Sequence, residues 1–190
     1  MNATMTSQTS KVRNGIDVAA LESTVEAVRA NPAAGQTHWA VHSRWVGGTR
    51  SDHMIDGCQI GGQTIDRRFT LRVDEPRELL GTNQYANPQE HLLASINACM
   101  LVGYAAAAAH MGVTLTKLEM NITGDIDLRN FLGIDPSVPA GYESLQQTVT
   151  VAGDGTPEQF QQIHEIVKKT SPNYFNITQA VATPSRLVVE

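Results

Sequence analysis

Cys99 is the side chain of this sequence best suited to covalent chemistry, because a thiolate is a strong nucleophile and a thiol can be oxidised reversibly. At 100° per residue, the helical face that holds it also carries Leu92, Ser95, Ile96, Val102, Gly103 and Ala106. A cysteine in such apolar surroundings is usually an unreactive small hydrophobic residue, so spacing alone favours a structural role. A reactive thiolate would need a nearby cation, because the start of the helix is three turns away and its dipole has faded there.

Cys58 is the only other thiol. Two cysteines in 190 residues do not make a secreted disulfide scaffold, and no C-x-x-C spacing indicates zinc. The six histidines show neither H-E-x-x-H nor H-x-H spacing. We therefore expect no metal, no cofactor and a reducing compartment. The polar opening of the chain lacks the apolar core of a signal peptide, so we expect the cytoplasm.

The charge balance restricts the partners. The chain has 19 Asp and Glu residues against 14 Lys and Arg residues, which gives a net charge of −5. Without a basic excess, we expect no binding to nucleic acid. The length of 190 residues predicts one folded core, and the 41% hydrophobic content excludes disorder as the main state.

A long helix over residues 88–111 is expected to carry Cys99. Asn87 is typical of an N-cap, Pro88 of the first helical position, and Glu90 of the residue that closes a capping box. At 1.5 Å per residue this helix would be about 36 Å long. The uncharged segment from Leu92 to Ala109 reaches the length of a membrane span. Its many alanines, its polar residues and the lack of a basic flank favour a buried central helix instead, so we expect no membrane association.

Alternating apolar residues predict strands on both sides of this helix. Before it we expect a strand over 39–45, a second after Met54 and a third over 65–73, joined as an antiparallel meander. After it we expect strands at 118–122, 145–151 and 186–189, and two further helices are expected at 18–30 and 157–171. These elements predict an α+β fold with a largely antiparallel sheet. Residues 1–14 are expected to form a flexible tail, 15–36 a helical extension and 37–190 the main domain.

The segment from Asn87 to Cys99 resembles the central-helix motif of the OsmC/Ohr family of thiol-dependent hydroperoxide reductases, in which an Asn/Ser-Pro-Glu start leads through a Leu-rich and Ala-rich helix to the reactive cysteine. Further matching features, in the family's order, are Trp45 with Gly47-Gly48-Thr49-Arg50 ahead of Asp56-Gly57, then Asp74-Glu75-Pro76, Gly112-Val113 and Ser171-Pro172. The resemblance spans roughly residues 38 to 189. It implies an intertwined homodimer in which sheets wrap two long central helices.

The resemblance also implies a site made of a cysteine, an arginine and a glutamate that holds the arginine. Cys99 takes the first role and Arg50 the second, with Arg44 as a competitor. The position of the family's glutamate is Gln89, and the carboxylate stands one place later, at Glu90. An amide holds a guanidinium less firmly than a carboxylate does, and Glu90 is equally suited to capping the helix.

A second departure concerns Ser171, which stands where the family usually has a resolving cysteine. Serine cannot form a disulfide, so the expected activity is a one-cysteine peroxidase that takes electrons from an external thiol. Cys58 could replace the resolving cysteine only if the two Cα atoms lay within about 7 Å, and otherwise it is an unpaired structural or surface thiol.

The apolar residues around Cys99 bear on the substrate. An apolar wall of Leu92, Ile96 and Val102 would favour organic hydroperoxides over hydrogen peroxide, because it rewards burial of an alkyl tail. The alternative is a redox-inactive OsmC-like dimer that binds a small lipophilic ligand. A third reading is a purely structural or partner-binding dimer with no pocket near Cys99.

Overall fold

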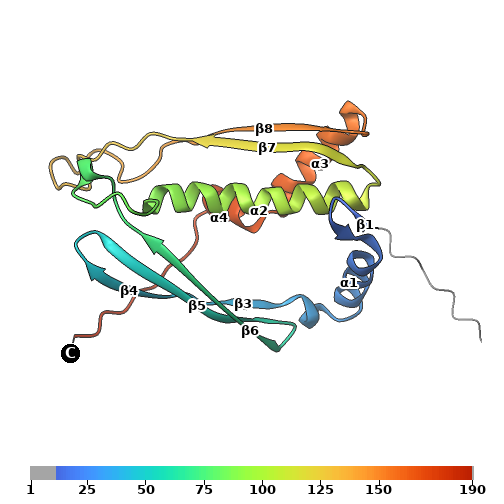
Figure 1. Cartoon of the computed structure of the whole chain (residues 1–190), viewed down its shortest axis with the longest axis horizontal. Helices are drawn as coiled ribbons and strands as arrows, with labels where there is room; N and C mark the ends of the chain where they lie inside the picture. The colour runs from blue at the N-terminus through green and yellow to red at the C-terminus, as the bar shows by residue number, and fades with distance from the viewer. Residues whose placement is uncertain (1–11, 190) are drawn as a thin grey trace, which may run out of the picture. The chain divides into compact units, whose positions relative to one another are not determined.

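The computed structural model describes residues 12–189, so most of the expected tail lies outside the described residues (Figure 1). The chain divides into two compact units, one up to Ala94 and the other from Ser95 onward. The long helix α2 (Pro88–His110) begins in the first unit and continues through the second.

The first unit begins with a short hairpin and a helix. Strands β1 (Val12–Arg13) and β2 (Ile16–Asp17) pair antiparallel, and α1 (Val18–Ala30) follows directly. The N-terminus of α1 is capped by the Asp17 side chain, which accepts a hydrogen bond from the Ala20 N–H at 3.1 Å. The helix expected over residues 18–30 is therefore confirmed. A short 3-10 helix, η1 (Pro32–Gly35), leads into the sheet.

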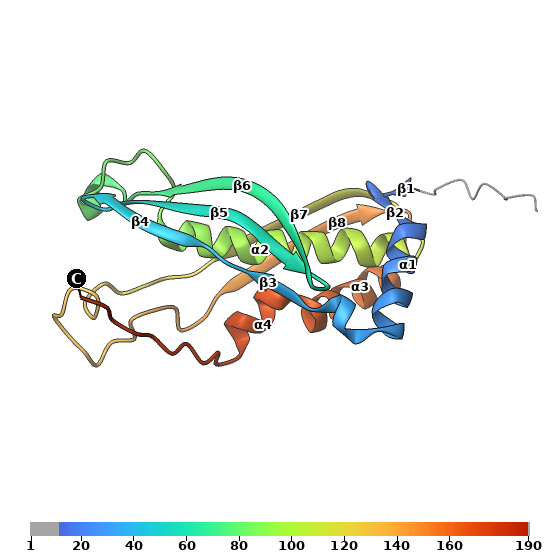
Figure 2. The ribbon, with the colours of Figure 1, turned by 90° about the horizontal axis from the view of Figure 1, so that it is seen from below.

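An antiparallel sheet forms the rest of the first unit. Its members are β3 (Thr37–Trp39), β4 (His42–Gly47), β5 (Arg50–Ile60) and β6 (Gln63–Val73). The central strand β5 pairs with β6 along one edge, while β4 and then β3 pair with successive halves of the other edge (Figure 2). The expected antiparallel meander is confirmed, with two corrections. The first strand is interrupted at residues 40–41, and the second begins at Arg50, well before Met54.

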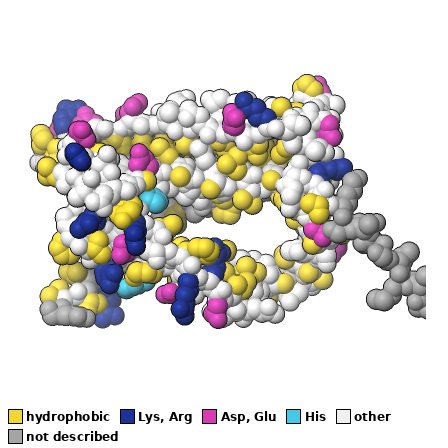
Figure 3. Space-filling view, in the orientation of Figure 1, with side chains coloured by type: hydrophobic (Ala, Val, Ile, Leu, Met, Phe, Trp, Pro, Cys, Tyr) yellow, Lys and Arg dark blue, Asp and Glu magenta, His cyan; other side chains and the backbone are white. Residues whose placement is uncertain are grey.

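Both faces of this sheet are largely uncovered. Trp39 is 60% exposed, Trp45 73% and Phe69 52%. Among the described residues of the first unit, only Cys58, Val73 and Asp74 are buried. The alternating apolar residues of these strands are typical of a sheet with one covered face, but the first unit has no layer that covers either face. Figure 3 shows apolar side chains on the molecular surface.

Helix α2 starts as its sequence predicts. The Asn87 N–H donates to Glu90 Oε2 at 2.8 Å, and the Glu90 N–H donates to Asn87 Oδ1 at 2.8 Å, which forms the reciprocal capping box. The buried residues of α2 are Ile96, Met100, Tyr104, Ala108 and Ala109. Apart from Ala109 they are spaced four residues apart, so a single stripe of the helix is buried.

Among the described residues, α2 is the one helix long and apolar enough to span a membrane. This is weak evidence for such a span, because the core helix of a globular domain has the same length and composition.

The second unit packs a hairpin and two helices with its part of α2. Strands β7 (Leu115–Thr123) and β8 (Gln146–Gly153) pair antiparallel, and α3 (Pro157–Thr170) and α4 (Pro172–Thr178) follow. The expected strands at 118–122 and 145–151 are confirmed, with shifted ends. Helix α3 begins at a capping box between Thr156 and Gln159 and buries Ile163 and Val167 completely. A Cβ atom on Gly103 would lie 3.3 Å from Val167 Cγ1, so α2 and α3 approach closely at this glycine.

The prediction of a strand at 186–189 is wrong. Residues 180–189 form no regular structure, and Leu187 is 86% and Val189 83% exposed. Their apolar side chains suit a strand, but a strand also needs a neighbour whose backbone N–H and C=O groups it can pair with. Within the described chain, these residues have no such pairing.

Candidate functional site

The reactive-cysteine candidate lies against the residue that stands in the resolving position. The Ser171 hydroxyl donates to Cys99 Sγ at 3.2 Å. Ser171 is only 5% exposed, whereas Cys99 is half-buried and its thiol is free. By family resemblance, Cys99 stands at the position of the reactive cysteine and Ser171 at that of the resolving cysteine. In the second unit these two residues are in hydrogen-bond contact.

The junction of two helices holds Ser171 in this position. Ser171 is the C-cap of α3 and the N-cap of α4, because Pro172 starts a new helix directly after it. Its N–H donates to the Val167 carbonyl at 2.9 Å, and its Oγ accepts from the Tyr174 N–H at 3.4 Å. With the oxygen engaged as an acceptor, the hydroxyl hydrogen is left to point at the sulfur.

Helix α4 is also tied to the cysteine face of α2. Asn173 Nδ2 donates to the Ser95 carbonyl at 2.9 Å, one turn before Cys99. Along α2, Asn97 Oδ1 accepts from Gln147 Nε2 of β8 at 3.0 Å. These contacts tie α4 and β8 to α2, and the α4 contact lies one turn from the thiol.

The apolar wall expected beside Cys99 is only partly present within one chain. Ile96 is buried at 1% exposure, whereas Leu92 is 40% and Val102 70% exposed. Ile96 therefore belongs to the core of its own chain. Val102 contributes to no enclosure within its own unit.

A polar pair lies two turns after Ile96, where the Tyr104 side chain is buried and that of His164 is half-buried. The Tyr104 hydroxyl forms a short hydrogen bond with His164 Nδ1 of α3. Burial raises the pKa of Tyr104 to about 12, and the negative charge of Glu165 adds to the effect. The phenol therefore stays protonated at neutral pH and links α2 to α3.

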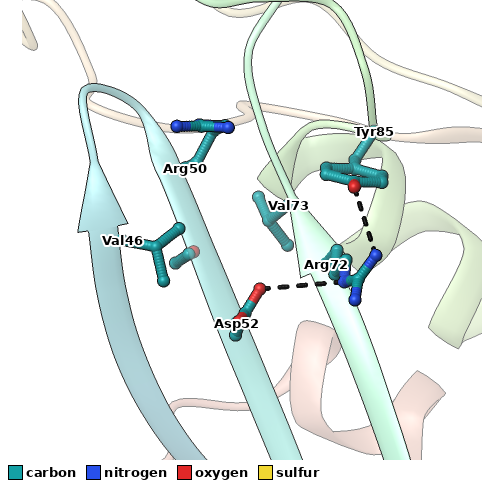
Figure 4. A pocket seen from close by; sticks show the side chains of 7 residues that line it. Val46, Arg50, Asp52, Arg72, Val73 and Tyr85 are labelled. Atoms are coloured by element: carbon teal, nitrogen blue, oxygen red, sulfur yellow. Dashed lines mark hydrogen bonds and ion pairs between the residues drawn. The ribbon is translucent and has the colours of Figure 1, made fainter.

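Arg50, the predicted partner of the thiolate, lies in the first unit. It is the first residue of β5, directly after the β4–β5 turn, where Gly47 and Gly48 adopt φ of 123° and 59°. It lines an open cavity of about 190 Å³. The other lining residues are Val46, Ser51, Asp52, Arg72, Val73 and Tyr85 (Figure 4).

A buried carboxylate holds the rim of this cavity. Asp74 is 0% exposed and accepts hydrogen bonds from Thr49 Oγ1 at 2.8 Å, from the Gln84 N–H at 3.1 Å, and from both the N–H and the hydroxyl of Thr82. These bonds, that of Thr82 above all, hold the pKa of Asp74 well below its usual range. Because Thr49 precedes Arg50 and Gln84 precedes Tyr85, Asp74 positions two residues of the cavity.

The two alternatives for the family's glutamate have different outcomes in the structure. The Glu90 carboxylate is engaged in the capping box with Asn87, as one of its two readings predicted. Gln89 is exposed, and neither residue lines the cavity that holds Arg50. A contact from Gln89 or Glu90 to Arg50 thus stays a prediction, as does the contact between Arg50 and Cys99.

Cys58, the other thiol, is 6% exposed and lies on β5 opposite Trp39 on one side and Ile65 on the other. Both cysteines are free. Sheet residues thus surround Cys58, as expected of a structural thiol.

Sequence reasoning missed three residues of the cavity and its support: Asp52, Arg72 and Asp74. Asp74 belongs to a quoted motif, and a carboxylate directly after a strand and before Glu75-Pro76 is a signal for a loop-stabilising acceptor. Asp52 and Arg72 give no local signal. They meet because the β5–β6 register places them directly opposite each other.

The family model for OsmC-like protein matches residues 81–184, more than half of the chain. A comparison with curated proteins found no match.

Solved structures resemble the fold. An OsmC-like protein from Mycoplasma pneumoniae is 16% identical, with a TM-score of 0.58 over 74% of this chain and 86% of that one. An OsmC-like protein of unknown function from Vibrio cholerae is 12% identical, with a TM-score of 0.51 over 72% and 91%. A Psychrobacter arcticus protein named for osmotic stress induction and detoxification response is 13% identical, with a TM-score of 0.54 over 70% and 84%. At these identities the likeness concerns the fold. Because the family model matches more than half of the chain, including all of α2, α3 and α4, the chain belongs to the OsmC-like family.

Proposed function

We propose that this protein is a thiol-dependent organic hydroperoxide reductase that uses Cys99 as its only redox-active cysteine. The observation that carries the proposal is the free, half-buried Cys99 whose sulfur receives a hydrogen bond from Ser171 at 3.2 Å, in a chain of the OsmC-like family. The thiolate is the reactive form of such a cysteine.

The reaction balances as follows. The Cys99 thiolate attacks the distal oxygen of the hydroperoxide, the O–O bond breaks, and the alkoxide leaves and takes up a proton to become the alcohol. Cys99 is then a sulfenic acid. A first external thiol condenses with it, releasing water and forming a mixed disulfide, and a second external thiol displaces Cys99 as the free thiolate.

Arg50 is the proposed cation of this site. Its guanidinium would keep Cys99 ionised and stabilise the negative charge that develops on the leaving oxygen. Among the described residues Arg50 forms no ion pair with a carboxylate, so its charge is available. Gln89 and Glu90 are proposed to orient it, with Glu90 also capping α2.

We propose a homodimer as the active form. Val102 and the tryptophans of the first unit are exposed in the single chain, and a second copy would cover such surfaces. Leu92, Ile96 and Val102 would then contact the organic part of the substrate. Two free cysteines fit a reducing cytoplasm.

The Ser171 position supports the one-cysteine cycle. A cysteine there would be placed to resolve the sulfenic acid, but a hydroxyl cannot do so. The same observation favours a second candidate function, a redox-inactive dimer that binds a lipophilic ligand, because the loss of a resolving thiol is also expected when the cycle has been lost.

Two measurements separate these functions. Peroxide consumption with dithiothreitol or dihydrolipoamide is expected for the wild type and not for Cys99→Ser. Intact mass after one equivalent of cumene hydroperoxide is expected to show one added oxygen or a thiol adduct at Cys99. Equal background consumption by both proteins, with unmodified Cys99, would refute the peroxidase and leave the binding function.

A further inference from the structure

Helix α3 contacts α2 along a row within the second unit, and polar contacts lie at both ends of this row. At one end, Ser171 Oγ lies 3.2 Å from Cys99 Sγ. At the other end, the Tyr104 hydroxyl is hydrogen-bonded to His164 Nδ1. The row runs forward along α2 and backward along α3, so the two helices are antiparallel here. Figure 2 shows α3 and α4 following each other along α2.

The contacts between the two ends of the row are apolar. Ile163 and Val167 of α3 are 0% exposed, and a Cβ atom on Gly103 of α2 would lie 3.3 Å from Val167 Cγ1. Glycine has no side chain that interlocks with the facing helix, and apolar contacts have no preferred direction. These contacts therefore hold α3 close to α2, but they specify its rotation and its position along α2 less sharply than a hydrogen bond does.

The hydrogen bond between Tyr104 and His164 supplies this direction. Tyr104 is 1% exposed, and burial together with the negative charge of Glu165 raises its pKa to about 12. The phenol therefore keeps its hydrogen at neutral pH and donates it to Nδ1, which leaves the ring hydrogen of a neutral His164 on Nε2. A polar pair in an apolar interface costs desolvation, and its best-attested use is to select one register of two helices.

The register selected here is the one that brings residue 171 to the reactive-cysteine candidate. Seven residues separate His164 from Ser171, which is two turns of α3, so both lie on the face toward α2. A rotation or slide of α3 that breaks the bond to Tyr104 also moves the Ser171 hydroxyl. Its contact with Cys99 Sγ is 3.2 Å long and would not survive such a movement.

We propose that Tyr104 and His164 are positioning residues, whose hydrogen bond fixes α3 in the register that holds residue 171 against the Cys99 sulfur. Their effect on peroxide turnover rests on the proposed function. The positioning itself does not, so the two can fail separately.

The first experiment measures positioning without peroxide chemistry, as the equilibrium constant for a disulfide between Cys99 and a cysteine at position 171. Full-length Cys58→Ser/Ser171→Cys protein is equilibrated with reduced and oxidised glutathione, and the disulfide fraction is read by mass after acid quenching. Tyr104→Phe, which removes the donor, and His164→Leu, which removes the acceptor, are each expected to lower this constant at least tenfold. His164→Asn is expected to stay within threefold of the parent, because Asn Oδ1 stands at the place of Nδ1 and accepts the same hydrogen bond.

Two control variants separate positioning from stability. Gln162→Leu changes an exposed residue of α3, whereas Thr156→Ala removes the N-cap of α3 and lowers Tm without touching the pair of Tyr104 and His164. Both are expected to change the disulfide constant less than threefold. Circular dichroism verifies folding, and if Tyr104→Phe does not fold, the comparison of His164→Leu with His164→Asn decides alone.

Four results would overturn the positioning role. The parent forms no disulfide, so that residue 171 does not lie against the sulfur. Tyr104→Phe keeps the disulfide constant of the parent. Thr156→Ala lowers this constant as much as Tyr104→Phe does, or His164→Asn lowers it as much as His164→Leu does.

The second experiment tests the effect on turnover with Ser171 in place. Tyr104→Phe and Ser171→Ala are expected to lower kcat/KM for cumene hydroperoxide, with dithiothreitol as the reductant, at least threefold and by the same factor. The double variant is expected to show no further loss, because both changes act through the Ser171 hydroxyl. A factor near one, or losses that multiply in the double variant, would overturn the effect on turnover. If the wild type consumes no hydroperoxide, the proposed function fails, whereas the glutathione equilibrium still decides the positioning.

Discussion

Replacing Ser171 by cysteine tests the geometry on which the one-cysteine cycle depends. Ser171 Oγ and Cys99 Sγ are 3.2 Å apart, and serine and cysteine have nearly the same shape. After Cys99 becomes a sulfenic acid, the new thiol can attack its sulfur, so that water leaves and a disulfide forms. We therefore expect Ser171→Cys to convert the protein into a two-cysteine enzyme.

The expected stabilisation follows from the sequence separation. The two residues are 72 positions apart, and closing a loop of this size removes chain entropy worth about 4 kcal/mol in the unfolded state. Weakening of the α4 N-cap, which the Ser171 hydroxyl provides, costs about 1 kcal/mol. The oxidised variant is therefore expected to gain about 3 kcal/mol, or roughly 6–12 °C in Tm for a chain of this length.

The assay combines mass and melting in a Cys58→Ser background, which leaves one possible pair of thiols. One equivalent of cumene hydroperoxide is expected to remove two hydrogens from the Ser171→Cys variant, whereas the parent gains one oxygen. Dithiothreitol is expected to reverse both the mass change and the increase in Tm.

Thr170→Cys is the matched control, because Thr170 is exposed and its hydroxyl binds the Ile166 carbonyl at 2.8 Å. It is expected to form no disulfide with Cys99. If Ser171→Cys gains oxygen without forming a disulfide, or if Thr170→Cys crosslinks equally well, residue 171 does not face the sulfur and the reasoning fails.

Four further outcomes are expected. Asp74→Asn should lower the free energy of unfolding, because it weakens the hydrogen bonds at the rim of the cavity. Hydrogen bonds hold the pKa of the Asp74 carboxyl below its usual 3.8, so the difference in unfolding free energy between wild type and variant, measured in urea, should shrink as the pH falls below about 4. Because the pKa of Tyr104 is raised from 10 to about 12, this phenol ionises near pH 10 in the unfolded chain and only near pH 12 in the folded chain, so stability should fall as the pH rises from 10 to 12, and the alkaline absorbance titration and melting of Tyr104→Phe should lack this component. Asn87→Ala should cost about 1 kcal/mol in urea unfolding, since it removes half of the α2 capping box. Val102→Glu should shift light-scattering mass from dimer to monomer, and a mass unchanged from the wild type would contradict a dimer interface at this residue.

Local signals in the sequence predicted three of the four α-helices of the described chain, α1, α2 and α3, and missed α4 after Pro172. The capping residues at Asn87 and Thr156 act within one turn, so they can be recognised without knowing the fold. The alternation of apolar and polar residues also predicted the paired strands β7 and β8. The strand expected at 186–189 failed because alternation and apolar composition do not provide a pairing partner.

The candidate site was predictable only as far as family resemblance assigned roles. Cys99 and Ser171 lie 72 positions apart, and their contact arises from the way α3 and α4 pack with α2. The Asp74 network likewise joins Thr49 to the loop before α2, which no short-range pattern encodes. Arg72 and Asp52 are ordinary exposed strand residues until the β5–β6 register pairs them.

The exposed side of α2 links the sequence to the proposed assembly. The helix carries no charge from Leu92 to Ala109, yet its own chain buries only one stripe, and Val102 is left 70% exposed. Such a surface is covered by lipid or by protein. The Asn97 and Ser95 hydrogen bonds to β8 and α4 place polar contacts along the same helix, and the OsmC-like family model includes it. The proposed homodimer would cover this surface and close the apolar wall beside Cys99. The same contact would then make the dimer a condition for selectivity toward organic hydroperoxides.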